Sequence, residues 1–292
     1  MSYRNYDELR IQMSTSKSLK TPLRYPGGKS RAVVKLFQYF PDLSKYREFR
    51  EPFLGGGSVA IAITKRYPDM SIWVNDLYQP LYDFWTQLQH NPDELSKEIR
   101  KLKEANPDPE TARGLFNESK DYLGEDYRRS SPFSRAVSFF IVNKCSFSGL
   151  TESSSFSSQA SQSNFSLKGI DRLPEYGELI QNWTITNLDY ARMLSDEKDI
   201  FVYLDPPYDI KDNLYGRKGG LHKKFDHDIF AQTCDGYCSP MLISYNSDQI
   251  VKDRFKEWTV AEFAHTYTMR SVGCYNIDQA SRKELVLTNY EM

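Results

Sequence analysis

The segment Phe201–Tyr208, Phe-Val-Tyr-Leu-Asp-Pro-Pro-Tyr, constrains the fold more than any other part of this chain. Its first four residues are apolar and β-branched or aromatic, as in a parallel strand that is buried on both faces. The two prolines end hydrogen bonding in that strand because proline has no backbone N–H. Asp205 is therefore predicted to lie at the carboxyl end of a central strand, where open α/β sheets bind their ligands. Taken alone, the Asp-Pro-Pro sequence is also compatible with an ordinary turn.

The composition excludes several classes of protein. The chain has 292 residues and a formal net charge of −1, which excludes general coating of nucleic acid, so any such contact has to come from local basic surface. No apolar run approaches the length of a membrane span and the polar N-terminus has no signal-peptide pattern, which predicts a soluble cytoplasmic protein. The spacing of the cysteines predicts reduced structural thiols and no metal site. These are Cys145, Cys234, Cys238 and Cys274.

A glycine-rich segment at Glu51–Ser58 precedes an apolar, helix-compatible stretch at Val59–Lys65. Glycine lets the backbone approach a ligand closely, and the N-terminus of the following helix offers free N–H groups. The next short strand, Ile72–Val74, is followed by Asn75 and Asp76. An acid at the end of this second strand is suited to accept hydrogen bonds from both hydroxyls of a ribose. Helix capping is the alternative role of Asp76, and the glycine-rich segment upstream favours ribose binding.

Three other stretches have a composition that suggests a role. At Thr21–Lys29, a Pro-Gly-Gly sequence predicts a tight turn before a helix at 30–40, although such turns are common. Residues 153–163 are dominated by Ser and Gln, which predicts a loop that buries no core. Residues 211–224 are rich in Lys, Arg and Gly, and a solvated loop is the alternative to a phosphate-binding role. The candidate phosphate contacts are Arg128, Arg129, Lys218, Lys223 and Lys224. Arg135 is considered with Arg128 and Arg129 for the same role.

The segment Asp205–Tyr208 resembles the catalytic motif of methyltransferases that transfer the methyl group of S-adenosylmethionine to amino nitrogens. The order of the motifs along residues 20–290 resembles the Dam-like class of DNA adenine-N6 methyltransferases. In that order, the aromatic-Pro-Gly-Gly-Lys segment Tyr25–Lys29 comes first and the glycine-rich segment Phe53–Gly57 second. Asn143–Leu150 is similar, in part, to the family segment that opens the hairpin in contact with DNA.

The resemblance implies a role for each of these residues. The Asp205 carboxylate and the Pro206 carbonyl would accept the two N–H bonds of the target amino group and localise its lone pair, and Tyr208 would stack on the flipped base. Asp189 would contact the adenine of the cofactor, and Tyr190 would pack on that ring. The alternative roles are helix capping for Asp189 and core packing for Tyr190. The implied cofactor contacts are Tyr25, Lys29, Phe53, Gly55, Gly57, Asp76, Asp189, Tyr190 and Asp205. The implied DNA contacts are Asn143 and Lys144, together with Arg128, Arg129, Lys218, Lys223 and Lys224.

These observations predict a Rossmann-like, doubly wound α/β sheet with one antiparallel strand and an inserted, mostly helical DNA-recognition lobe. Residues 1–85 and 180–292 would form the catalytic domain that binds S-adenosylmethionine, and residues 86–179 the inserted lobe. The expected function is site-specific adenine-N6 methylation of double-stranded DNA, by an enzyme associated with the nucleoid. The alternatives are methylation of RNA adenine or of the cytosine N4-amino group in DNA, and a nucleic-acid-binding relative without turnover.

Overall fold

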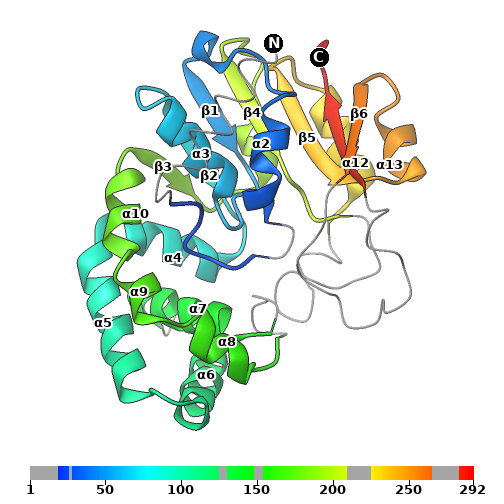
Figure 1. Cartoon of the computed structure of the whole chain (residues 1–292). Coiled ribbons are helices and arrows are strands. Elements are labelled where there is room, and N and C mark those ends of the chain that lie inside the picture. Colours follow the sequence, from blue (N-terminus) through cyan, green and yellow to red (C-terminus); the bar gives the residue numbers. More distant parts are fainter. Residues whose placement is uncertain (1–18, 26–27, 125–129, 148–153, 209–224, 265–282) are drawn as a thin grey trace.

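The described residues form a seven-stranded sheet with helices around it (Figure 1). The computed structural model describes residues 19–25, 28–124, 130–147, 154–208, 225–264 and 283–292. The order of the strands in the sheet is β3-β2-β1-β4-β5-β7-β6. They are β1 (Glu48–Glu51), β2 (Ser71–Asn75), β3 (Trp183–Thr186), β4 (Ile200–Leu204), β5 (Met241–Asn246), β6 (Thr259–Ala264) and β7 (Lys283–Thr288).

The sheet is parallel except for β7. Strands β3, β2, β1, β4 and β5 pair in parallel, and β7 pairs antiparallel with both β5 and β6. The prediction of a Rossmann-like sheet with one antiparallel strand is therefore confirmed for the described residues. Strands β1 and β4 are neighbours although two strands separate them in the sequence, so the winding of the chain reverses between them. Ligands of open α/β sheets bind at the carboxyl ends of the strands beside such a reversal.

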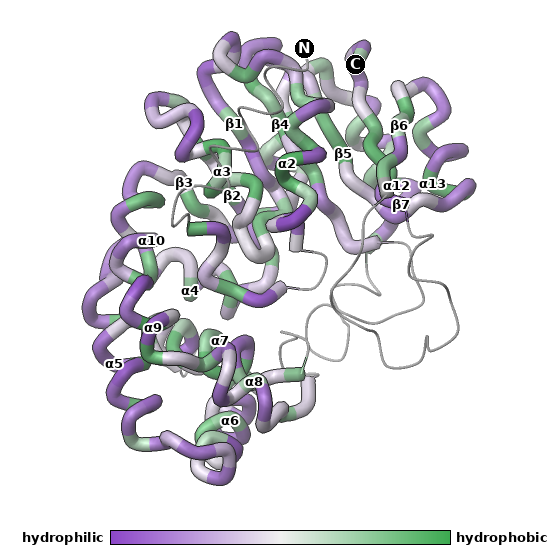
Figure 2. Tube along the Cα trace, in the orientation of Figure 1, coloured by the Kyte–Doolittle hydropathy of each residue, from purple (hydrophilic) through white to green (hydrophobic). Residues whose placement is uncertain are grey.

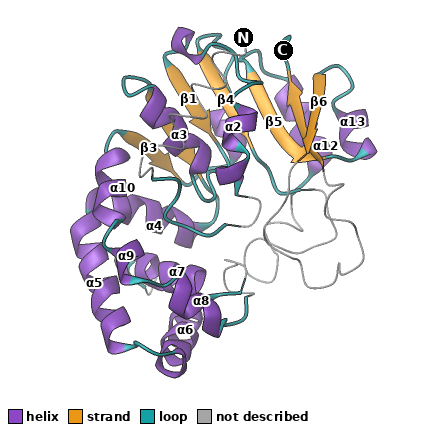
Figure 3. Cartoon of the chain, in the orientation of Figure 1, coloured by secondary structure: helices purple, strands orange, loops and turns teal. Residues whose placement is uncertain are grey.

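Helices cover both faces of the sheet, as Figure 3 shows. All five residues of β4 are buried, and their side chains alternate between the two faces. Phe201 and Tyr203 belong to the hydrophobic cluster that also contains α2 and α3, whereas Val202 and Leu204 belong to the cluster of α12 and α13. Burial on both faces explains the continuous apolar run that precedes Asp205. These four helices are α2 (Val33–Leu36), α3 (Ser58–Arg66), α12 (His227–Asp235) and α13 (Gln249–Arg254).

A helical insertion separates β2 from β3 in the sequence and lies beside the edge of the sheet that β3 forms (Figure 1). Its central helix is α7, where ten of the fourteen residues are buried. On α7, Arg135 donates a hydrogen bond of 2.6 Å to Asp83 of α4, and both side chains are buried. Arg135 therefore does not lie at the surface, where its predicted contact with phosphate would require it. The outer helix α5 is largely hydrophilic along its length (Figure 2). The insertion contains α4 (Gln79–His90), α5 (Pro92–Ala105), α6 (Pro109–Gly124), α7 (Pro132–Cys145), α8 (Ser158–Ser163), α9 (Leu167–Ile170) and α10 (Leu173–Leu179).

The structure corrects the prediction of a loop over residues 153–163. The described part of this segment contains helix α8, which begins after Ser157, whose side chain accepts a hydrogen bond from the Ala160 backbone. Ala160 and Ser161 are buried. One small apolar residue and a serine cap therefore suffice for this short polar helix. Its weak local helix propensity is supplemented by packing against the other helices of the insertion. The helix predicted over 30–40 is also shorter, since it consists of the 3₁₀ turn η1 (Lys29–Arg31) and α2.

The described residues lack two features, a membrane-spanning helix and a cluster of metal ligands. No helix in the described ranges is long and apolar enough to cross a membrane. Within the same ranges, no group of three or more His, Cys, Asp or Glu side chains is arranged to hold a metal ion.

Candidate active site

Asp205 directly follows β4 and accepts hydrogen bonds through both of its carboxylate oxygens. The Lys29 ammonium donates to Oδ1 at 2.7 Å and to Oδ2 at 2.8 Å, and the Ser244 hydroxyl on β5 donates to Oδ1 at 2.9 Å. Burial raises the pKa of Asp205, and the opposing effect of the Lys29 charge does not cancel that rise. The predicted strand end therefore carries a carboxylate with three of its about four acceptor positions in use.

A second carboxylate, Glu284 on β7, completes this buried cluster. Its Oε1 lies 3.2 Å from the Lys29 Nζ, and the Tyr208 hydroxyl donates to the same oxygen. Lys29 also donates to the Tyr208 hydroxyl at 2.6 Å. The Lys29 side chain is 2% exposed, that of Glu284 0% and that of Asp205 20%. Burial alone would lower the pKa of Lys29, but Asp205 and Glu284 together raise it above the ordinary value.

The glycine-rich turn is shaped by two aromatic side chains. Gly55 and Gly57 have φ angles of 48° and 67°, which favour glycine. A Cβ on Gly55 would lie 2.9 Å from the Tyr25 ring, and one on Gly57 would lie 2.8 Å from the Trp85 ring. The Trp85 indole N–H also donates to the Gly55 carbonyl at 3.1 Å. The turn therefore requires glycine for its backbone angles and for its close contacts with Tyr25 and Trp85.

Asp76 follows β2 and faces this turn. Its carboxylate accepts hydrogen bonds from the Gly55 backbone N–H at 2.9 Å and from the Tyr78 backbone N–H at 3.0 Å. Burial raises the pKa of Asp76 to about 6, although both backbone hydrogen bonds act in the opposite direction. A carboxylate has about four acceptor positions, so Asp76 retains capacity for hydroxyl donors from a ligand.

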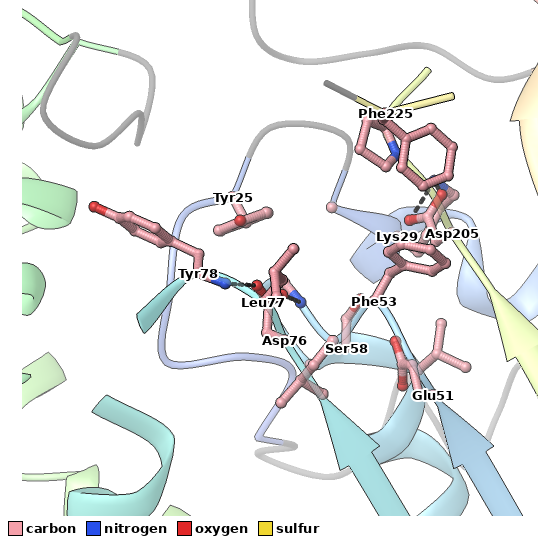
Figure 4. Close-up of a pocket in the computed structure, with 17 residues that line it drawn as sticks. Tyr25, Lys29, Glu51, Phe53, Ser58, Asp76, Leu77, Tyr78, Asp205 and Phe225 are labelled. Carbon is pink, nitrogen blue, oxygen red and sulfur yellow. Dashed lines mark hydrogen bonds and ion pairs between the residues drawn. The ribbon is translucent and has the colours of Figure 1, made fainter. Parts of the chain in front are cut away.

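A pocket of about 780 Å³ of empty space, part of it open to solvent, joins these features. Figure 4 shows Lys29 directed to Asp205 and Asp76 directed to the glycine-rich turn. Phe53 and Phe225 add aromatic surface to the lining. The pocket thus combines a strand-end carboxylate, backbone N–H groups and aromatic rings. These groups fit an adenosine-containing ligand: the carboxylate suits the ribose hydroxyls, and the rings suit the base.

Two predicted cofactor contacts lie outside the lining of this pocket. Asp189 is exposed and caps the 3₁₀ turn η4 (Tyr190–Met193), because its side chain accepts from the Ala191 backbone N–H at 2.9 Å. The Tyr190 ring stacks on Phe53, with ring centroids 5.4 Å apart. In this structure Asp189 is therefore a helix cap and Tyr190 a packing residue, which are the alternative roles considered for them. Tyr190 supports Phe53, which lines the pocket.

The predicted DNA contacts fall into two groups. Asn143 is fully buried and exchanges hydrogen bonds with the Arg24 backbone, so it connects the insertion to the segment before Tyr25. Lys144 is partly buried, and burial lowers its pKa to about 8. The other predicted contacts lie outside the described residues. They are Arg128, Arg129, Lys218, Lys223 and Lys224.

Four residues of the site were not assigned any role from the sequence. Ser244 interrupts the apolar run of β5, and that interruption is a signal for a buried functional group. Glu284 follows Lys283 at the start of β7, ahead of the apolar run, and gives no such signal. Glu51 lines the pocket, accepts from the Ala60 backbone N–H at 2.8 Å, and has a pKa raised well above its ordinary value by burial. Trp85 gives no local signal, because its contact with the glycine-rich turn depends on how the insertion folds back.

Comparison with known proteins identifies the class. A family model described as D12 class N6 adenine-specific DNA methyltransferase matches residues 25–270. This match includes the Lys29 segment, the glycine-rich turn, the helical insertion and the Asp205 segment. The chain therefore belongs to the D12 class of N6 adenine-specific DNA methyltransferases, a family that uses S-adenosylmethionine and acts on DNA.

Curated relatives with distant sequence similarity are named as modification enzymes. Modification methylase StsI of Streptococcus sanguinis is 24% identical over 312 residues, which cover 95% of this chain and 44% of StsI. The chain thus spans less than half the length of that relative. Type II methyltransferase M1.LlaDCHI of Lactococcus lactis subsp. cremoris is 22% identical over 289 residues, 94% of this chain and 96% of the relative. Type II methyltransferase M.MjaIII of Methanocaldococcus jannaschii is 23% identical over 202 residues, 65% of this chain and 69% of the relative.

The contacts of the glycine-rich turn predict the effect of a single methyl group. Gly57→Ala should lower the free energy of unfolding by about 2–4 kcal/mol, because a left-handed backbone angle and a clash with Trp85 both disfavour the new Cβ. Gly114→Ala is the matched control, since no described atom beyond its chain neighbours and the backbone of its own helix lies within 4 Å of the position where its Cβ would be on α6. That control should be more stable than the parent by about 0.5–1 kcal/mol. Urea unfolding of both variants tests this, and equal stabilities would contradict it.

Proposed function

We propose that Asp205 activates the target adenine during methyl transfer to DNA. An exocyclic amino nitrogen is a poor nucleophile because its lone pair is delocalised into the ring. The Asp205 carboxylate and the Pro206 carbonyl would accept its two N–H bonds and localise that lone pair. S-adenosylmethionine supplies the methyl group, which its sulfonium makes electrophilic. The observation that supports this role most is the position of Asp205 at the carboxyl end of β4, beside the pocket and the reversal of the sheet.

We also propose how this chain holds the cofactor. The Asp76 carboxylate would accept hydrogen bonds from the ribose hydroxyls, and the backbone of the Gly55–Gly57 turn would contact the methionine part together with Tyr25. Phe53 would pack on the adenine ring, with Tyr190 behind it. Tyr208 would stack on the flipped base. The Tyr208 ring packs against Tyr245 at a centroid distance of 5.8 Å, which would hold it in position for such contact.

The substrate proposed for this site is double-stranded DNA. Residues 86–179 would form the recognition lobe, and residues 1–85 with 180–292 the catalytic domain, except that the boundary at residue 85 falls within α4, so the first turns of α4 would belong to the lobe as well. Lys144 and the basic residues predicted at 128–129 and 218–224 would contact the phosphates, while Asn143 would position Arg24 and the segment that leads into Tyr25. A DNA substrate is also the reason for proposing the cytoplasm, with nucleoid association, as the location of the protein.

Methyl transfer from tritiated S-adenosylmethionine tests the proposal. The purified protein is incubated with unmethylated genomic DNA, with the same DNA made single-stranded, and with RNA, and the methylated nucleoside is identified by mass spectrometry. N6-methyldeoxyadenosine formed fastest in duplex DNA is the expected result. N4-methylcytosine as the product, or faster transfer to RNA, would overturn the proposed substrate in favour of one of the alternatives.

The raised pKa of Asp76 predicts how cofactor binding depends on pH. Because ionised carboxylates accept stronger hydrogen bonds than neutral ones, S-adenosylmethionine should bind about tenfold more weakly at pH 5 than at pH 7.5. The stability of the ligand-free protein has the opposite sign. The native state binds more protons than the unfolded chain between pH 3.8 and about 6, so the contribution of Asp76 to stability falls as the pH rises through this window.

Asp76→Asn is the matched variant for both effects. Calorimetric titration of the cofactor should show that the variant binds weakly at both pH values, with the pH dependence removed. Unfolding experiments should show that the difference in stability between the variant and the parent changes between pH 4 and pH 7. A parent protein whose cofactor affinity is the same at pH 5 and pH 7.5 would contradict ribose binding by Asp76.

A further inference from the structure

In the proposed reaction, Lys29 and the target amino group would donate hydrogen bonds to the same carboxylate, that of Asp205. In the structure, both oxygens of this carboxylate accept from the Lys29 ammonium, and Oδ1 also accepts from Ser244. The proposed role of Asp205 requires it to accept an N–H bond from the target amino group. Three of about four acceptor positions of this carboxylate are already filled, two of them by Lys29, so the amino group and Lys29 would compete for its oxygens. A Lys29 hydrogen bond that weakens or breaks in this competition leaves the ammonium short of an acceptor. The Lys29 side chain is only 2% exposed, so water cannot simply replace the lost acceptor.

Glu284 is a second carboxylate beside the Lys29 ammonium, in addition to Asp205. Its carboxylate is fully buried, its Oε1 lies 3.2 Å from the Lys29 Nζ, and it accepts from the Tyr208 hydroxyl. Glu284 sits on β7, whereas Asp205 follows β4, and β5 lies between these strands in the sheet. The Lys29 ammonium is thus held between two carboxylates that come from different strands.

We propose that Glu284 is a positioning residue for methyl transfer, which receives the Lys29 ammonium when the target amino group occupies Asp205. The Tyr208 hydroxyl, which donates to the same carboxylate, holds Glu284 beside Lys29 while the amino group binds Asp205. Without Glu284, a buried ammonium would have Asp205 as its remaining carboxylate partner, and Lys29 would compete with the adenine for it. This inference rests on the proposed role of Asp205.

Kinetics of Glu284→Gln test the inference, with unmethylated genomic DNA as substrate and tritiated S-adenosylmethionine as donor. The variant should lower kcat about 10–100-fold, and its dissociation constant for S-adenosylmethionine should stay within about twofold of the parent value. Because Glu284 acts through Lys29, the double variant Lys29→Met/Glu284→Gln should be no slower than Lys29→Met alone. Glu262→Gln is the matched control on the neighbouring strand β6 and should keep the parent kcat, since Glu262 binds Lys252 and Lys283 at the surface.

Two results would overturn the inference: a parent-like kcat in Glu284→Gln, or an effect of this substitution that is equally large with and without Lys29. If Glu284→Gln does not fold, Glu284→Asp replaces it, because this variant keeps the buried charge but withdraws it from Lys29. A reduced kcat with unchanged cofactor affinity supports the inference, and a parent-like kcat overturns it. Asp205→Asn is measured in parallel. If that variant keeps turnover, the proposed function fails; if it is inactive while Glu284→Gln is parent-like, only the role of Glu284 fails.

Discussion

Asp205→Asn is expected to reduce methyl transfer at least about hundredfold, because a positioned acceptor at a reacting nitrogen contributes that much or more. The substitution keeps the size of the side chain and removes the charge that strengthens the hydrogen bond to the amino group. Lys29 keeps Glu284 as a counter-ion, so the fold should persist. Single-turnover transfer of tritium from S-adenosylmethionine to unmethylated genomic DNA measures the effect.

A matched control lies at the opposite end of the same strand. Asp199 precedes β4, is half exposed, and pairs with Arg47 at the surface. Asp199→Asn should keep the parent rate of methyl transfer, because Asp199 is at the end of β4 remote from Asp205. Turnover in Asp205→Asn equal to that of the Asp199 control would remove Asp205 from the chemistry.

Lys29→Met is expected to lower the free energy of unfolding by about 3–5 kcal/mol, as is typical when one partner of a buried ion pair is removed. The loss arises because Asp205 and Glu284 remain buried without the ammonium between them. The pKa of Asp205, which burial already raises, should then rise further because the Lys29 charge no longer opposes that effect. By linkage, the variant becomes less stable as the pH rises from about 5 to 8, and the loss is largest at pH 8.

Denaturant unfolding of the parent and the variant at pH 5 and pH 8 measures this loss. Lys256→Met is the control, because this lysine is 78% exposed and its partner Glu257 is 85% exposed. Substitutions at such surface positions usually change stability by less than about 0.5 kcal/mol. A loss below about 1 kcal/mol in Lys29→Met would mean that the ammonium does not stabilise the two carboxylates.

The sequence predicted the parts of the site that depend on local pattern. The apolar run and the two prolines after it located Asp205 at a strand end, since burial on both faces and the missing N–H groups are properties of the residues themselves. Gly55 and Gly57 were predicted from the same kind of local requirement, and both have the positive φ angles that favour glycine. The order of the motifs along the chain is the order that a doubly wound sheet requires. The observed strand order therefore confirms the predicted fold.

Residues whose roles depend on distant contacts were missed or assigned differently. Glu284 meets Lys29 only because β7 enters the sheet beside β5, and no pattern around either residue encodes that pairing. Asn143 was expected at the DNA surface, but it is buried against the backbone of Arg24. Tyr208 was assigned through its ring, and its hydroxyl in the Lys29 and Glu284 cluster became visible only in three dimensions.

Modification-aware sequencing tests the central claim most directly. Chromosomal DNA is sequenced from cells without endogenous adenine methylation that express either the parent protein or Asp205→Asn at equal levels. N6-methyladenine at one recurring sequence context is expected with the parent protein, and none with the variant. Methylation that persists unchanged with Asp205→Asn, or a folded parent protein that modifies only cytosine, would contradict it.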